Sequence, residues 1–443
     1  MGQQTAGRAG SQTADPWRYR WIVLGIATFT QAASGFFVGG IGALGVHLHR
    51  ALDLSTAQLG LLVSAAQLAP LAGLLVAGEL LDRYSERWVV GIGAGVVALA
   101  LGAGSLAPGY TALLVALLVV GVGYSTVQPG GSKSVASWFD ASQRGFAMGI
   151  RQAGLPLGAA LASAVLPFVA EEFGWRATLL TGGFAALLGA GLFMGSYRRP
   201  PTLPTLQDKG SPDPLAAQLR ARLRMLREPS TVKIMLSGIS LISVQYGVGV
   251  LTVLHLHQAS AVGAGQAALI LVASQGAGVA GRICLAAWSD RTSSGRYAIV
   301  LVCMVAVIAG LAVLVTPAGR APVVASCAFV WLGFFGFGWY GPWVAYVTEE
   351  APPGKTGFAL GLAMSVNQIA IVTVPPVLGL LVDLTSSFTP AWALLSLLTV
   401  IALVVTAETE RRTRGGTPSP AASSTRTSRK RSSESFWITN RTE

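Results

Sequence analysis

Apolar and polar residues alternate along this chain in long blocks, with little mixing inside each block. A helix needs about 20 consecutive apolar residues to cross the hydrocarbon core of a bilayer, since it rises about 1.5 Å per residue. Apolar blocks of this length occur twelve times. They cover residues 21–46, 58–81, 88–107, 110–138, 145–170, 176–197, 231–256, 265–288, 297–316, 321–347, 356–382 and 390–407. We therefore predict an all-α membrane protein with twelve transmembrane helices.

The second half of the sequence repeats the first in the same direction. Asp290-Arg291 follows Asp82-Arg83 after 208 residues. The same offset aligns His47-Leu48-His49 with His255-Leu256-His257, Gln58 with Gln266, Gln67 with Gln275, and Gly73 with Gly281. At an offset of 212, the segment 145–149 (GFAMG) is echoed by 357–361 (GFALG). Parallel repeats of a six-helix unit are typical of one class of secondary transporters. We expect two pseudo-symmetric six-helix bundles.

The predicted bundles are residues 21–197 and 231–407, with polar segments around them. The sequence predicts an N-terminal tail over 1–20, a connector over 198–230 and a disordered basic tail over 408–443, which is rich in Ser, Thr, Pro and Arg. The arginines at the end of the connector predict a basic helix lying on the inner leaflet.

Composition and charge placement agree with a membrane protein. The chain has 52% hydrophobic and 11% charged residues, whereas ordinary soluble domains have about 25% charged residues. Its net charge of +12 is concentrated in alternate loops and in the termini, which excludes a nucleic-acid interpretation. These basic segments contain Arg18 and Arg20, Arg83 and Arg87, Arg144, Arg198 to Lys233, Arg291 and Arg296, and Lys355. Because basic loops stay in the cytoplasm, we expect a multi-pass protein of the cell inner membrane with both termini cytoplasmic.

The loop after the second span carries a family resemblance. Its Gly78-x-x-x-Asp82-Arg83 resembles the signature loop of the major facilitator superfamily, and Ser289-Asp290-Arg291 is similar to the second copy of that loop. The resemblance covers residues 21 to about 407 and implies two bundles that rock around a central cavity. Ser85 and Glu86 depart from the family pattern, which has a glycine and often a basic residue there.

These loops predict a conformational latch. Asp82 can accept hydrogen bonds from the N-terminal amides of a neighbouring helix, and Arg83 and Arg87 can pair with carboxylates. Its predicted members are Gly78, Asp82, Arg83, Arg87, Asp290 and Arg291. A plain solvated turn is the alternative interpretation.

Three basic residues inside the spans have no counterpart in the other repeat. Arg282 aligns with Leu74, Lys133 with Ala345, and Arg151 with Ala363. A symmetric scaffold needs its residues twice, whereas a substrate is not symmetric, and a charge in the bilayer is costly unless it faces a cavity or a partner. Arg282 lies about 12 Å inside, eight residues before the end of its span. The other two lie closer to a helix end, where a long stem can carry the charge out.

These basic residues also resemble sequences of organic-anion transporters. Residues 281–283 (GRI) are similar to a helix of monocarboxylate and oxalate:formate transporters, whose arginine binds a substrate carboxylate. Residues 133–139 resemble anion:cation symporters, and residues 149–158 resemble cyanate-type permeases. Spans one, four, seven, eight, ten and eleven contain no internal Asp or Glu. The predicted substrate-binding residues are Arg282, Arg151, Lys133, Gln67, Gln275, Gln152 and Asn367.

We therefore expect a secondary transporter that moves a small organic anion, a mono- or dicarboxylate, by alternating access. No nucleotide-binding Gly-rich loop, catalytic constellation or metal cluster is apparent, so we expect neither an enzyme nor a cofactor. The expected partners are the anion and the lipid bilayer, the protein being a monomer. Coupling to a proton or a counter-anion stays open. The alternatives are an exporter of a drug or secondary metabolite and a transporter-like sensor.

Overall fold

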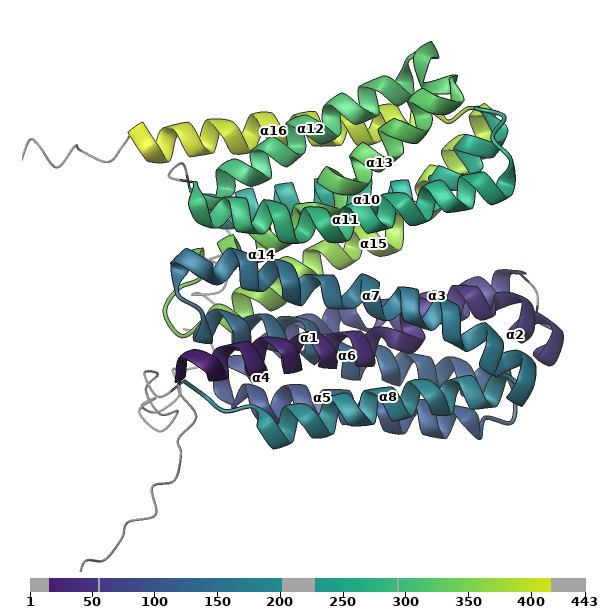
Figure 1. The fold of residues 1–443 in the computed structure, drawn as a ribbon, viewed down its shortest axis with the longest axis vertical. Coiled ribbons are helices and arrows are strands. Elements are labelled where there is room, and N and C mark those ends of the chain that lie inside the picture. The colour runs from purple at the N-terminus through teal and green to yellow at the C-terminus, as the bar shows by residue number, and fades with distance from the viewer. Residues whose placement is uncertain (1–15, 55, 201–227, 293–294, 416–443) are drawn as a thin grey trace, which may run out of the picture.

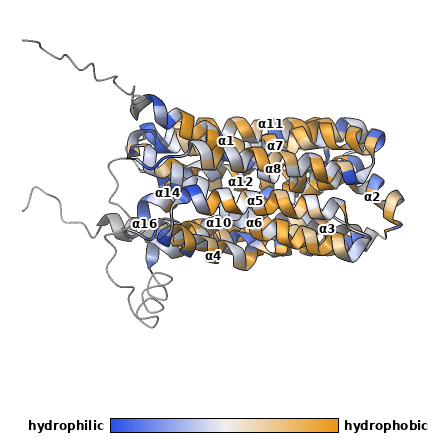
Figure 2. Ribbon diagram, turned by 90° about the horizontal axis from the view of Figure 1, so that it is seen from below, coloured by the Kyte–Doolittle hydropathy of each residue, from blue (hydrophilic) through white to orange (hydrophobic). Residues whose placement is uncertain are grey.

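The computed structural model describes residues 16–54, 56–200, 228–292 and 295–415, and within these ranges all regular structure is helical. Within the described residues, twelve helical segments are long and apolar enough to cross a membrane, which confirms the predicted fold class. The hydrophobic residues occupy the middle of the helices, and hydrophilic residues gather towards their ends (Figure 2). The predicted basic helix of the connector falls on residues 201–227, outside the described residues.

The twelve segments form two bundles, one above the other in Figure 1. The first bundle contains α1 (Pro16–Gly40), α3 (Thr56–Leu68), α4 (Pro70–Arg83), α5 (Glu86–Ser105), α6 (Tyr110–Trp138), α7 (Ala141–Phe173) and α8 (Trp175–Ser196). The second contains α10 (Pro229–Gln258), α11 (Ala264–Arg291), α12 (Arg296–Val315), α13 (Pro322–Gly338), α14 (Tyr340–Glu350), α15 (Thr356–Thr385) and α16 (Thr389–Gly415). The short helices η1 (Ile41–Leu44) and α2 (Gly45–Leu52) lie between α1 and α3 in the sequence. The short helix η3 (Pro317–Arg320) lies between α12 and α13.

Two predicted spans are each divided into two helices near a proline. The span over 58–81 consists of α3 and α4, and Pro70 is the first residue of α4. The span over 321–347 consists of α13 and α14, with Pro342 in the first turn of α14. Proline has no N–H to donate to the preceding turn, so the helix bends or restarts at these positions.

Two predicted helix ends differ from the structure. The first span ends at Gly40 instead of residue 46, and the chain continues into η1 and α2. The last helix, α16, continues to Gly415, beyond the predicted end at residue 407. Residues 408–415, which the sequence assigned to the disordered tail, therefore form the last part of α16, beyond its apolar section. The rest of the predicted tail, from residue 416, lies outside the described residues.

The two bundles meet where α4 packs against α15 and α7 packs against α11. We call the end of the molecule where α4 and α11 end and α7 and α15 begin the latch end. Glycines allow the backbones to approach there. A Cβ atom at Gly78 would lie 2.7 Å from the carbonyl oxygen of Gly357, and one at Gly357 would lie 2.6 Å from that of Gly78. Small residues at helix crossings allow such close packing.

Candidate functional site

A cavity of about 340 Å³ lies between the two bundles. Both bundles contribute to its wall, and the lining residues come from the middle of the helices and from their sections away from the latch end. Its polar lining residues are Gln67, Tyr124, Gln128, Gln152, Gln245, Tyr246, Gln275, Arg282, Tyr340, Asn367 and Gln368. Among the residues that the structure describes, the lining includes no Asp, Glu, Lys or His, and Arg282 is its one ionised group at neutral pH.

Arg282, in α11, is held in place by carbonyl groups of both bundles. Its Nε donates to the carbonyl oxygen of Phe337 at 3.1 Å, and its Nη1 donates to that of Gln152 at 2.7 Å. The guanidinium carbon lies 5.8 Å from the ring centroid of Tyr340, within the range of a cation–π contact. Nη2 makes no hydrogen bond in the described part of the chain. The side chain is only 5% exposed, yet it forms part of the cavity wall.

Amide groups connect the bundles around this arginine. The Gln128 amide donates to the hydroxyl of Tyr340 at 2.9 Å. Gln368 donates to the backbone oxygen of Gln67 at 2.8 Å and to its side-chain oxygen at 3.2 Å. Gln152 donates weakly to the Ser132 hydroxyl at 3.5 Å. These bonds join the first bundle to the second or orient groups at the cavity wall.

Other polar atoms of the wall have no partner among the described residues. They are both amide atoms of Asn367, the Gln245 carbonyl oxygen and the Tyr124 hydroxyl. A buried polar group without a hydrogen bond costs about 1–3 kcal/mol. A bound molecule with hydroxyl or carbonyl groups can therefore gain hydrogen bonds from this wall.

Of the seven residues predicted to bind substrate, five line the cavity: Gln67, Gln152, Gln275, Arg282 and Asn367. The predicted set of substrate-binding residues does not include the tyrosines Tyr124, Tyr246 and Tyr340, because aromatic residues inside apolar spans look the same whether they face lipid, core or cavity. Gln128, Gln245 and Gln368 carry a usable signal, since amides at membrane depth seek polar surroundings.

Arg151 does not line the cavity. It is completely buried inside the first bundle, and its Nη2 donates to the carbonyl oxygens of Val127 at 3.0 Å and Gln128 at 2.7 Å. Gly131 makes room for it, because a Cβ there would lie 2.6 Å from Nη2. Nε and Nη1 of Arg151 have no partner among the described residues. The arginine therefore lies behind the cavity wall formed by Gln128 and Gln152.

Lys133 lies at the latch end, away from the cavity lining. Its Nζ is 3.1 Å from Asp82 Oδ1 and 3.5 Å from Glu86 Oε1, and it also donates to the carbonyl oxygen of Leu81. The sequence-based placement of Lys133 beside the substrate does not match this geometry. The reason is that acids at the ends of α4 and α5 reach the lysine and neutralise it.

Asp82 joins the first bundle to the second. Its Oδ1 accepts a hydrogen bond from the Gly357 amide and its Oδ2 accepts one from the Phe358 amide, both at 2.8 Å. These amides open α15, where the helix dipole favours a negative charge. This is the contact that the sequence predicts for Asp82. Glu86, behind it, also pairs with Arg199 at 3.1 Å.

Asp290 makes the reciprocal contact from the second bundle to the first. Its carboxylate accepts from the amide of Gly145 at 2.8 Å and from that of Phe146 at 2.7 Å, in the second turn of α7. Arg296 pairs with Asp290 and, at 2.6 Å, with Glu349. Glu349 is also 3.4 Å from Arg144 of the first bundle. The repeated segments 145–149 (GFAMG) and 357–361 (GFALG) thus provide the backbone amides that bind the two aspartates.

The other predicted latch residues make weaker contacts. Arg83 pairs with Glu79 at 2.7 Å in its own helix, and half of its side chain is exposed. Arg87 donates to the carbonyl oxygen of Met194, within the first bundle. Arg291 is exposed at the end of α11. The predicted latch did not include Glu86, Arg296 and Glu349, which belong to this network. Glu86 and Arg296 lie four and six residues after the two aspartates, and this proximity was the available signal, whereas Glu349 is distant from both in the sequence.

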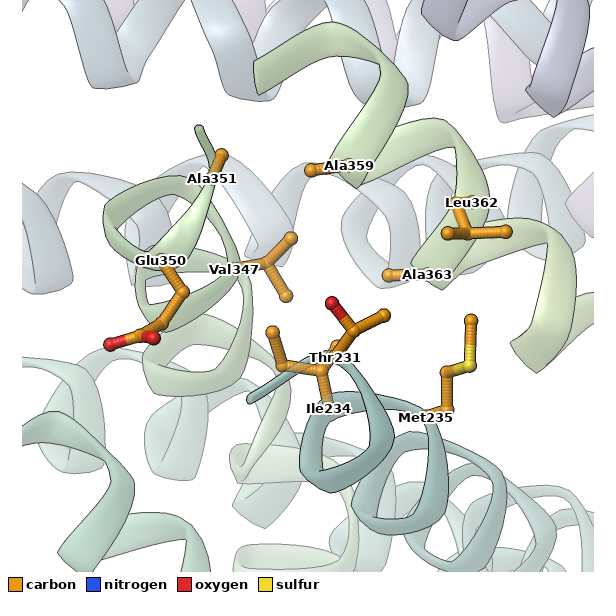
Figure 3. Close-up of a pocket in the computed structure, with 9 residues that line it drawn as sticks. All are labelled: Thr231, Ile234, Met235, Val347, Glu350, Ala351, Ala359, Leu362 and Ala363. Atoms are coloured by element: carbon orange, nitrogen blue, oxygen red, sulfur yellow. The ribbon is translucent and has the colours of Figure 1, made fainter. Parts of the chain in front are cut away.

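A second, smaller cavity lies at the latch end of the second bundle (Figure 3). It is formed by α10, α14 and α15, and its volume is about 20 Å³. Most of its wall is apolar, with Thr231 and Glu350 as the polar groups. A space of this size holds about one water molecule. It is therefore too small for an organic substrate.

The comparisons with known proteins identify the class. The model of the Major Facilitator Superfamily matches residues 24–375, and the chain therefore belongs to this superfamily of membrane transporters, which are not enzymes. It is similar to an uncharacterized MFS-type transporter of Mycobacterium tuberculosis, with 27% identity over 85% of this chain and 82% of the relative. It also resembles a probable galactarate/D-glucarate transporter of Bacillus subtilis, with 23% identity over 86% and 89% of the two chains.

The fold is similar to that of a solved transporter of the same superfamily. The crystal structure of FucP in the outward conformation matches 88% of this chain and 99% of that chain, with a TM-score of 0.69 and 17% identity. The twelve helices in two bundles are therefore arranged as in this superfamily.

Proposed function

We propose that this protein is a secondary transporter of a small organic anion that carries a carboxylate and several hydroxyl groups. The observation that carries the proposal is Arg282, which is the one ionised residue in a cavity wall whose described residues include no acid. A guanidinium binds a carboxylate through parallel hydrogen bonds, and Nη2 of Arg282 is not used by other described residues.

The remaining wall supports a polyhydroxylated substrate in preference to a simple fatty or aromatic acid. Seven amide side chains and three tyrosines surround the arginine. Amides donate and accept hydrogen bonds and so match hydroxyl groups in either direction. The similarity to a probable galactarate/D-glucarate transporter supports a sugar acid as the substrate class. The predicted substrate ligands retained in this proposal are Arg282, Gln67, Gln152, Gln275 and Asn367.

The reciprocal contacts of Asp82 and Asp290 support alternating access. Each aspartate ties one bundle to a helix start of the other, so together they close the latch end. The basic loops of the sequence favour a cytoplasmic location for this end. In the proposed cycle, this conformation therefore exposes the cavity to the outside, and rupture of the two contacts opens it to the cytoplasm.

Uptake into proteoliposomes tests this function. The purified protein is assayed with radiolabelled D-glucarate, galactarate, D-gluconate, D-glucuronate and lactate, in wild type and in Arg282→Ala. We expect saturable uptake of one or more sugar acids and at least a ten-fold loss in the variant, because a lost charge-assisted bond is worth about 1.5–3 kcal/mol. Arg320→Gln, which removes an exposed arginine, is the matched control and retains uptake. If the wild type takes up none of these acids, the proposed function is wrong and the exporter hypothesis replaces it.

A further inference from the structure

We infer that this transporter exchanges one organic anion for another and resets only slowly with an empty cavity. The inference rests on the proposed function and concerns the step after the substrate has been released. It is carried by the position of Arg282, whose guanidinium donates hydrogen bonds to both bundles.

Arg282 depends on the first bundle for one of its two acceptors. It donates to Phe337 in its own bundle at 3.1 Å and to Gln152 in the other bundle at 2.7 Å. Both acceptors are neutral backbone carbonyl groups. No carboxylate lies in the described part of the cavity wall, so the positive charge is partly compensated by the Gln152 carbonyl only while the bundles stay in contact at this point.

That contact lies at the helix crossing that must open. Gly149, one turn before Gln152 in α7, packs so closely on α11 that a Cβ would collide with the carbonyl oxygen of Arg282. When α7 separates from α11 to open the latch end, the Gln152 carbonyl leaves the guanidinium. Arg282 then keeps the Phe337 carbonyl and the ring of Tyr340, both neutral groups of its own bundle.

A bound carboxylate compensates Arg282 for the lost Gln152 carbonyl, whereas in an empty cavity nothing replaces that acceptor. The substrate carboxylate can replace the Gln152 oxygen as acceptor and cancels the charge of Arg282 during the transition. Without it, a buried cation loses a hydrogen bond, which is unfavourable in low-dielectric surroundings. The guanidinium does not release its proton in a protein, and the cavity wall, as far as the structure describes it, contains no Asp, Glu or His to take one up. The loaded protein therefore changes conformation faster than the empty one.

Efflux from proteoliposomes distinguishes exchange from net transport. Vesicles with the full-length protein are loaded with radiolabelled D-glucarate, with D-gluconate and D-glucuronate in parallel, and ionophores remove pH and voltage gradients. Efflux is measured into buffer with or without the same unlabelled acid. We expect efflux to be about ten-fold faster with external acid, the factor that corresponds to one lost charged hydrogen bond. Equal rates overturn the exchange inference and leave anion transport intact. No movement of any acid in either buffer overturns the proposed function together with this inference.

Two substitutions test the role of Arg282 in this ratio. In Arg282→Gln no charge is left uncompensated in the empty cavity, so we expect the ratio of the two efflux rates to fall towards one. Arg282→Lys retains the positive charge, so we expect it to show the wild-type ratio of efflux rates with a weaker affinity for the substrate. Arg320→Gln behaves as the wild type in both buffers. A wild-type ratio in Arg282→Gln contradicts the assignment to Arg282. If that variant moves no acid, the wild-type comparison alone decides the inference.

Discussion

Three basic side chains inside the helices, Lys133, Arg151 and Arg282, meet three different environments. Lys133 lies between two carboxylates, Arg151 donates to backbone carbonyls inside the first bundle, and Arg282 forms part of a cavity wall. A charged group at membrane depth is costly in each case unless something compensates it. The nature of the compensation decides the role: a carboxylate partner makes a structural ion pair, and a cavity without acids leaves a cation available to an anion.

Replacement of Lys133 tests its structural role. In Lys133→Met, Asp82 and Glu86, which are 3% and 2% exposed, lose a shared cation. Breaking a buried ion pair costs about 3–5 kcal/mol, so we expect a clearly lower thermal unfolding midpoint of the detergent-solubilised protein. Arg83→Gln, at a half-exposed pair, is the control with an effect of at most about 1 kcal/mol. An unchanged midpoint together with a raised KM for substrate would assign Lys133 to the cavity after all.

At the scale of the elements, the latch depends on how four helices end and begin. The helices α4 and α11 end in Asp-Arg. A Gly-Phe-Ala segment lies within the first two turns of α7 and α15, at residues 145–147 and 357–359, and a second glycine follows one turn later. The first two amides of this segment face the aspartate of the other bundle. The second glycine removes the side chain where the helices cross. One short motif thus provides both the charge contact and the close packing.

A methyl group at Gly149 tests the crossing of α7 and α11. Alanine is favoured over glycine in a helix by about 0.8–1.0 kcal/mol, so a stabilising effect would be expected from propensity alone. At Gly149 we expect the opposite, because the Cβ would collide with the carbonyl oxygen of Arg282. Spin-label distances across the latch end report the result: Gly149→Ala widens them. Gly191→Ala, at a helical position with open space around it, leaves them unchanged.

At the scale of the whole molecule, the two bundles are joined by two equivalent contacts, one contributed by each. Asp82 reaches from the first bundle to α15, and Asp290 reaches from the second to α7. Because the contacts are reciprocal, the bundles cannot separate at the latch end by breaking only one. The inter-bundle bonds of Gln128 and Gln368 at the cavity add to this closed arrangement.

Replacement of each aspartate by asparagine measures how much each of the two contacts contributes to closing the latch end. Asp82→Asn and Asp290→Asn keep the size of the side chain but lose the charge that favours the helix N-terminus, a contribution of about 0.3–1 kcal/mol that rises to about 2 in partly buried sites. We expect each variant to increase the population open at the latch end, and the double variant to increase it further. Labelling of a cysteine introduced between the bundles gives the population. If only one aspartate matters, the two contacts are not equivalent.

The sequence by itself determined the helical fold, the twelve spans and the duplication, because bilayer thickness and backbone hydrogen bonding impose a length and a polarity on every span. It also singled out Arg282 and the two aspartates. Arg282 has no counterpart in the other repeat, which indicates a role in binding an asymmetric substrate, whereas the two aspartates are counterparts of each other, which indicates a role in the symmetric scaffold. The tertiary structure alone decided that Lys133 pairs with Asp82 and Glu86, that Arg151 stays behind the cavity wall and that tyrosines complete the cavity. The physical reason is that helix position specifies depth in the membrane, whereas the partner of a side chain depends on how helices from distant parts of the chain pack against one another.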